Sequence, residues 1–217
     1  MSYGHEKVFF KGVLSGIVVG LAATGYLAAY TFTGNKIIGG LLFSFALVTI
    51  VSRNYALYTG RIGYLLPKKP GYLVHILKVL LSNIVGVAII GLLVKFSGIQ
   101  VNGITMVEQA TNTLNDKLVF QWYQTFILSI FCGILMYIGV DSSKKNISDV
   151  NKIFLLIGSV ILFLVASFEH SIATLFYLFL GNVWSLKMIL YILIMIVGNA
   201  VGGIFMNLMH HKIGEDL

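Results

Sequence analysis

Long apolar stretches, separated by short polar segments, run through the whole chain. Six of these stretches stand out, at about residues 9–32, 37–66, 72–96, 119–140, 153–182 and 186–209. A helix that crosses the hydrocarbon core of a bilayer needs about 20 apolar residues, and four of the stretches have that length. The pattern therefore predicts an all-α integral membrane protein with six transmembrane helices.

The second and fifth stretches are about thirty residues long, and polar residues interrupt both. Ser52-Arg53-Asn54 lies within the second stretch, and Glu169-His170-Ser171 lies within the fifth. A charged side chain at the centre of a straight span costs at least about 2.5–3.5 kcal/mol, so we expect both helices to be broken at the midplane. Non-helical backbone at that depth has to line a path enclosed by protein. Because half-helix N-termini carry partial positive charge, such a path favours an anion or a neutral polar solute.

The two halves of the sequence share a pattern. Ser82-Asn83-Ile84-Val85-Gly86 resembles Gly198-Asn199-Ala200-Val201-Gly202 at an offset of 116 residues, and the same offset maps Arg53-Asn54 onto Glu169-His170. The repeat unit is then a span, a broken span and a span. Because three is odd, the second copy is expected to be inverted in the membrane. The alternative to an internal repeat is that these short matches arise by chance in apolar sequence.

The whole chain, residues 1–217, is expected to form a single membrane domain, with inverted repeats at about 9–96 and 119–209. With the N-terminus in the cytoplasm, most loop lysines fall on the inside, as the positive-inside rule requires. The inside lysines are Lys7, Lys11, Lys68, Lys69, Lys144, Lys145 and Lys212, with Arg61 and Lys152 near that side. The outside lysines are Lys36, Lys95, Lys117 and Lys187. An even number of spans then places both termini in the cytoplasm, with the protein in the cell membrane.

Composition excludes several classes of protein. Of the 217 residues, 58% are hydrophobic and 11% are charged, whereas a soluble domain carries about 25% charged residues. A soluble enzyme is therefore excluded. The net charge of +7 is scattered between the apolar stretches, which argues against a nucleic-acid-binding face. The single Cys132 gives no disulfide framework, and neither a metal nor a cofactor is expected.

Two motifs resemble the formate/nitrite transporter family. Phe168-Glu169-His170-Ser171-Ile172-Ala173 resembles its Phe-Glu-His-Ser-(Ile/Val)-Ala-Asn signature, and Leu57-Tyr58-Thr59-Gly60 resembles its Leu-Phe-Thr-(Gly/Ser) segment. Asn83 with Gly86 and Asn199 with Gly202 also fit, in the third and last spans. The resemblance implies an aquaporin-like fold and a homopentamer with one pore per protomer. It further implies passage of small monovalent anions such as formate, nitrite, hydrosulfide or lactate, with protons and the lipid bilayer as the other partners.

The resemblance also implies roles for individual residues. It matches His170 to the family's central pore histidine and Thr59 to the threonine opposite it. The residues at the hydrophobic constrictions are then Leu47, Leu57, Phe163 and Tyr58, the last replacing the usual phenylalanine. Lys117 corresponds to the extracellular vestibule lysine, and Lys152 to the lysine at the cytoplasmic start of the fifth span.

The chain departs from the family pattern before the second motif. Asn54, Tyr55 and Ala56 replace the usual Gly-Ala-(Glu/Asp), so a carboxylate is lost, and Arg53 precedes them. Our hypothesis is that Arg53 pairs with Glu169 across the midplane and replaces the missing interaction. The rival interpretation is that Arg53 faces the path as an anion site. The other residues expected to be structural near the breaks are Asn54, Asn83 and Asn199.

A proton donor would help an anion to cross. A bare anion in a dry constriction costs several kcal/mol, and an imidazole with an ordinary pKa of about 6.5 could donate the proton that neutralises it. We therefore expect His170 to couple transport to protons, although a structural histidine that caps the helix is the alternative. An aquaporin-like pore for neutral solutes is the second class, but the chain contains no Asn-Pro-Ala. A non-conducting scaffold would not explain the two polar breaks. An enzyme is not expected, because no nucleophile–base pair appears.

Overall fold

The computed structural model describes residues 3–68 and 70–214, with side chains from residue 6 onward. Lys69, one of the lysines used for the predicted orientation, lies outside the described residues. Within the described residues, four helices are long and apolar enough to cross a membrane: α1 (Tyr3–Thr33), α4 (Gly71–Ser97), α6 (Trp122–Ser142) and α9 (Leu186–Lys212). They coincide with the first, third, fourth and sixth apolar stretches, so the positions of these helices are confirmed.

The two longest stretches each contain separate helices. The second stretch holds α2 (Lys36–Ser52), α3 (Tyr58–Arg61) and the 3₁₀ helix η1 (Ile62–Leu65), and the fifth holds α7 (Asp149–Val165) and α8 (Ser171–Gly181). Asn54 and Ser167 follow the first helix of each set, with left-handed φ values of 51° and 57°. A left-handed residue cannot continue an α-helix, so the chain turns there in both stretches.

Backbone hydrogen bonds identify which residues of the two interruptions correspond. In the first, Tyr55 donates to the carbonyl of Ile50 and Ala56 donates to that of Lys11; in the second, Phe168 donates to Phe163 and Glu169 donates to Leu128. Ala56 is therefore the counterpart of Glu169, at an offset of 113 residues. The predicted equivalence of Arg53 and Glu169 is wrong by three residues. That prediction aligned the charged side chains of the two stretches. The left-handed residues Asn54 and Ser167, and not the charges, mark the corresponding backbone positions.

Glycines allow the outer helices of each half to approach closely. A Cβ atom on Gly86 of α4 would lie 2.2 Å from the carbonyl oxygen of Val13 in α1. A Cβ atom on Gly202 of α9 would lie 2.1 Å from the carbonyl oxygen of Ile130 in α6. Small residues at helix interfaces are typical of membrane proteins, since they increase van der Waals contact between the backbones. The pairs α1–α4 and α6–α9 are thus held by the same kind of contact.

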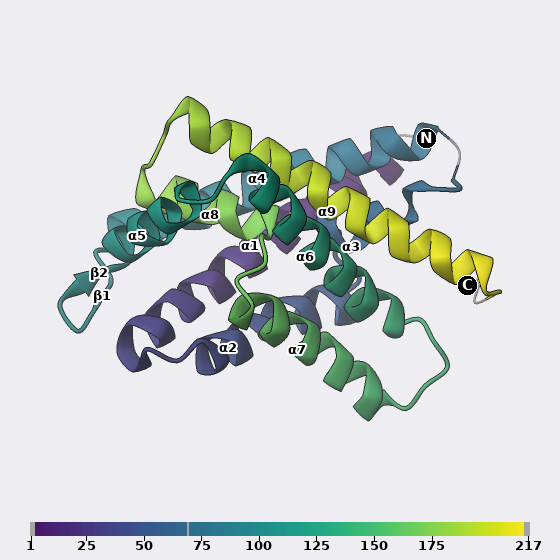
Figure 1. The fold of residues 1–217 in the computed structure, drawn as a ribbon, viewed down its shortest axis with the longest axis horizontal. Helices are drawn as coiled ribbons and strands as arrows, with labels where there is room; N and C mark the ends of the chain where they lie inside the picture. Colours follow the sequence, from purple (N-terminus) through teal and green to yellow (C-terminus); the bar gives the residue numbers. More distant parts are fainter. Residues whose placement is uncertain (1–2, 69, 215–217) are drawn as a thin grey trace.

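A polar segment between α4 and α6 adds elements that the apolar pattern did not predict. Strands β1 (Gln100–Val101) and β2 (Ile104–Thr105) form an antiparallel hairpin, followed by α5 (Met106–Leu118). Asn102 and Gly103 both have positive φ, as a two-residue hairpin turn requires. The hairpin lies at the opposite end of the molecule from the start of α1 and the end of α9 (Figure 1).

Candidate functional site

Asn83, from α4, holds the backbone at the first interruption. Its Oδ1 atom accepts a hydrogen bond from the Tyr58 N–H at 2.8 Å, and its Nδ2 atom donates to the carbonyls of Ala56 at 2.7 Å and Gly12 at 2.9 Å. Asn83 is completely buried. The side chain therefore satisfies polar backbone groups that helix geometry leaves unpaired.

Asn199, from α9, does the same at the second interruption. Its Oδ1 atom accepts from the Ser171 N–H at 3.0 Å, and its Nδ2 atom donates to the carbonyls of Glu169 at 2.8 Å and Ser129 at 2.9 Å. Asn83 and Asn199 thus bind corresponding backbone groups, as the shared Asn pattern of the third and sixth stretches suggested.

His170 and Thr59 meet where these two interruptions approach each other. His170 is the N-cap residue of α8, and its Nδ1 atom accepts the Ala173 N–H at 3.1 Å. Its Nε2 atom lies 3.1 Å from the Thr59 hydroxyl oxygen. Because Nδ1 is an acceptor, the neutral ring carries its proton on Nε2 and donates it to Thr59. The Thr59 hydroxyl hydrogen then stays available to a solute.

An aromatic ring packs against this pair. The Phe163 ring stacks on the His170 ring, with centroids 5.5 Å apart and planes inclined by 25°. Leu47 and Leu57, the aliphatic residues expected at the constrictions, are buried. Tyr58 differs, because its hydroxyl donates to the carbonyl of Ile196 at 3.0 Å and anchors the start of α3 to α9.

One polar pocket lies on the side of the β1–β2 hairpin, and we call it the hairpin-side pocket. It has a volume of about 280 Å³, and its charged lining residues are Lys36, Asp116, Lys117 and Glu169. The Lys117 ammonium donates to the Glu169 carboxylate at 2.5 Å, and Glu169 is only 2% exposed. Lys117 therefore lies at the site, as predicted, but its charge is compensated.

The hypothesis that Arg53 pairs with Glu169 is wrong, since Glu169 pairs with Lys117. Arg53 is exposed at the C-cap of α2, and it lines neither this pocket nor the second one described below. The three-residue difference in register explains its position, because Arg53 corresponds to Ala166 at the end of α7. The rival interpretation of Arg53 as an anion site finds no support in this geometry either.

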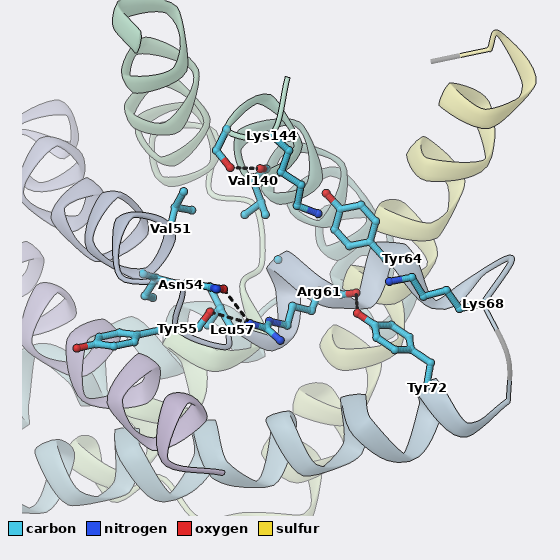
Figure 2. A pocket seen from close by; sticks show the side chains of 13 residues that line it. Val51, Asn54, Tyr55, Leu57, Arg61, Tyr64, Lys68, Tyr72, Val140 and Lys144 are labelled. Carbon is cyan, nitrogen blue, oxygen red and sulfur yellow. Dashed lines mark hydrogen bonds between the residues drawn. The ribbon is translucent and has the colours of Figure 1, made fainter. Parts of the chain in front are cut away.

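A second pocket lies on the side where α1 begins and α9 ends, and we call it the termini-side pocket. Its volume is about 410 Å³, and its lining includes Leu57, Arg61, Lys68 and Lys144. Figure 2 shows these side chains around the pocket, with Arg61 donating to Asn54 at 3.5 Å and to the Tyr55 carbonyl at 3.2 Å. From the sequence, Arg61, Lys68 and Lys144 were all interpreted as topology signals only, and none was predicted to line a pocket.

Lys152 does not belong to either pocket. It lies in the first turn of α7, where its ammonium pairs with the Asp149 carboxylate at 3.2 Å.

Tyr177 lines the hairpin-side pocket and was not predicted from the sequence. Its buried hydroxyl has no hydrogen-bond partner among the described residues.

The His170–Thr59 pair lies in a dry region between the two pockets. Leu57, two residues before Thr59, lines the termini-side pocket, and Glu169, next to His170, lines the hairpin-side pocket. His170 and Thr59 line neither pocket and are 3% and 1% exposed. Two polar pockets that approach one buried hydrogen-bonding pair from opposite sides form an arrangement suited to solute passage.

The chain is similar to known channel proteins in both sequence and structure. The formate channels FocA of Haemophilus influenzae and of Escherichia coli K12 are each 27% identical, over 80% and 82% of this chain. The chain spans about two thirds of their length, 66% and 67% respectively. A structure described as a pentameric formate channel with formate bound matches with a TM-score of 0.85 at 21% identity, over the full length of both chains.

A structure described as an FNT family ion channel matches with a TM-score of 0.83 at 18% identity, over 95% of this chain and 90% of that one. These two likenesses establish the fold. The model of the formate/nitrite transporter family matches residues 1–212, nearly the whole chain. With its long apolar helices, the protein is a multi-pass membrane protein that belongs to the formate/nitrite transporter family.

Proposed function

We propose that the protein is a membrane channel for small monovalent anions of the formate or nitrite class, and that the anion crosses at His170 and Thr59. The observation that carries this proposal is the buried hydrogen bond of 3.1 Å between these two side chains, with a polar pocket on either side. The similar FocA proteins are named formate channels, which favours formate first. Hydrosulfide and lactate are the alternative substrates.

In this proposal the helices form one membrane domain of six spans over residues 1–217. The second span consists of α2 with α3, and the fifth consists of α7 with α8, each broken at the midplane within repeats at about 9–96 and 119–209. Both termini are cytoplasmic. The matching pentameric structure supports a homopentamer, and the exposed apolar faces of the helices suit lipid and neighbouring protomers.

Charge attracts the anion toward the constriction. Arg61, Lys68 and Lys144 give the termini-side pocket a positive field, which raises the local anion concentration. On the other side Glu169 offsets Lys117, so the field there is weaker. At the constriction the anion replaces Thr59 as the acceptor of the His170 Nε2–H and accepts a second hydrogen bond from the Thr59 hydroxyl.

Proton coupling through His170 requires one structural change. Nδ1 accepts the Ala173 N–H, so a second ring proton can bind only when that hydrogen bond opens. Losing an N-cap costs about 1 kcal/mol, whereas a bare anion in a dry constriction costs several kcal/mol. Since the second term is larger, transient protonation of the ring beside an anion is favourable. When the ring gives its Nε2 proton to the anion, it becomes neutral again with its remaining proton on Nδ1. Once the neutral acid has left, Nδ1 loses this proton and Nε2 gains one, and the hydrogen bond from the Ala173 N–H to Nδ1 forms again.

A solute panel in proteoliposomes tests the function. Uptake of formate, nitrite and hydrosulfide should exceed that of protein-free liposomes by at least about tenfold, which corresponds to a barrier difference of about 1.4 kcal/mol. Glycerol uptake should match the protein-free control. If glycerol and water crossed faster with the protein while the anions did not, the neutral-solute pore would replace the anion channel.

A further inference from the structure

The termini-side pocket concentrates positive charge. Among the described residues, its charged lining residues are Arg61, Lys68 and Lys144, and neither an aspartate nor a glutamate of this set lines it. The hairpin-side pocket is different, since two carboxylates balance its two lysines. The two pockets therefore differ by about three formal charges at neutral pH.

In residues 3–68 and 70–214, the three cations contact amide and carbonyl oxygens, a histidine ring and tyrosine rings. Arg61 donates to the Asn54 amide oxygen and the Tyr55 carbonyl, and it lies 3.4 Å from the His75 ring nitrogen. The Lys144 ammonium lies 3.5 Å from the centre of the Tyr64 ring, and the Lys68 ammonium lies 4.4 Å from that of Tyr72. In the described part of the chain, these three residues form no salt bridge.

The Asp141 carboxylate, which attracts the Lys144 ammonium, makes its closest contacts with other groups. One of its oxygens accepts the Tyr64 hydroxyl at 2.8 Å, and the other lies 3.5 Å from the His210 ring nitrogen and 3.9 Å from the Lys145 ammonium. The bond from Tyr64 fixes the ring that Lys144 covers. Asp141 therefore helps to position Lys144 without lining the pocket.

The pocket is also larger than a formate or nitrite ion needs. Its volume of about 410 Å³ corresponds to more than ten water molecules, each of which occupies about 30 Å³ in the liquid. A monovalent anion would neutralise one of the three cations and leave two that repel each other. A dianion with several oxygen acceptors would contact more of them at once.

We propose that the termini-side pocket is a binding site for a free dianionic oxyanion, held by Arg61, Lys68 and Lys144. This site is one end of the proposed permeation path, and its regulatory effect rests on the proposed function. A dianion bound there cannot continue through the dry region at His170 and Thr59, because desolvating two charges costs more than desolvating one. The bound dianion would therefore occlude one end of the path.

Direct binding tests the site without relying on transport. The full chain in nanodiscs of zwitterionic lipid, which offer no anionic headgroup, is titrated calorimetrically with sulfate at constant ionic strength. We expect saturable binding of about one sulfate per chain, at least about tenfold tighter than formate. No saturable sulfate binding, or equal affinity for formate, would overturn the proposal.

Charge-matched variants locate the site. Lys144→Gln and Lys68→Gln should each weaken sulfate binding by about fivefold to tenfold, the effect of one lost charge-assisted contact. Lys212→Gln removes the same charge from an exposed position in the last turn of α9 and should change binding by less than about twofold. If all three variants had the same effect, the binding would be a general charge effect and the site would be wrong.

The pH dependence gives a second readout. Burial lowers the pKa of Lys144 to about 8, and repulsion from Lys68 and Arg61 acts in the same direction. The attraction of Asp141 opposes this shift of the pKa. Tyr64 is the other titratable group that contacts the Lys144 ammonium. Sulfate remains a dianion from pH 7 to pH 9, so its affinity should fall over this range as Lys144 loses its proton. Lys144→Gln should abolish this fall, and an unchanged pH profile in that variant would contradict the assignment.

Flux measurements separate this inference from the proposed function. Sulfate on the side of the termini-side pocket should slow formate uptake with a midpoint near its binding constant. Bound sulfate that leaves formate flux unchanged would overturn the occlusion. If formate flux were absent even without sulfate, the proposed function would be wrong. The calorimetric titration would still show whether the termini-side pocket binds a dianion.

Discussion

Replacing His170 with asparagine is expected to lower formate flux at pH 6 by at least about tenfold and to flatten its dependence on pH. Asparagine is an effective N-cap residue, so its oxygen can still accept the Ala173 N–H and preserve the start of α8. It has no group that titrates near neutral pH. The variant therefore removes the proton while keeping the local structure, and stopped-flow uptake from pH 5.5 to pH 8 measures the effect.

Two variants of Thr59 serve as the matched control. Thr59→Ser keeps the hydroxyl that lies 3.1 Å from the imidazole, whereas Thr59→Val keeps the shape and removes it. We expect the serine variant to retain most of the flux and the valine variant to lose it. A His170→Asn protein with the wild-type pH profile would mean that His170 only caps the helix.

Replacing Lys117 with methionine is expected to destabilise the protein by about 3–5 kcal/mol, because it leaves the buried Glu169 carboxylate without its partner. Methionine keeps the apolar stem of lysine, so the loss reflects charge more than packing. For a chain of this size the midpoint of thermal unfolding should fall by about 10 °C. Thermal unfolding of the purified protein in detergent measures the change.

The double variant Lys117→Met with Glu169→Gln distinguishes charge from packing. Glutamine keeps the shape of Glu169 without its charge, so the double variant should recover most of the lost stability. A double variant no more stable than Lys117→Met alone would show that the ion pair is not the cause. Lys152→Met is a suitable comparison, since Lys152 pairs with the exposed Asp149 and should lose less than about 1 kcal/mol.

The sequence predicted the features that depend on hydrophobic length. Membrane spans require about 20 apolar residues, so α1, α4, α6 and α9 could be located closely. Polar residues inside an apolar stretch are costly enough to mark the non-helical segments before α3 and α8. The motif around His170 also led to Thr59, although these residues are far apart along the chain.

Other features depend on geometry that apolar patterns do not carry. The equivalence of Arg53 and Glu169 failed because side-chain charge does not reveal backbone register, which Asn54 and Ser167 determine through their left-handed conformation. The partner of Glu169 was missed because Lys117 lies in α5, an amphipathic helix too polar for a span-based search. The asparagine and glycine after β1 were a hairpin signal that such a search ignores.

The cations of the termini-side pocket show a further limit. Lys68 and Lys144 were interpreted as markers of orientation, which is a property of whole loops. Only the fold brings these two loops together with Arg61 around one pocket. The positively charged residues can therefore be found in the sequence. It does not show that they meet around one pocket, or that no carboxylate among the described residues lines this pocket.

We propose that a small anion crosses the buried region at His170 as its neutral acid. The most direct test records formate uptake and internal pH together in proteoliposomes held at zero membrane potential, with protein-free liposomes as the background. About one proton should enter with each formate, because a charged species cannot cross the buried constriction cheaply. Formate uptake that leaves the internal pH unchanged and follows an imposed membrane potential would show that the bare anion crosses, and would contradict this proposal.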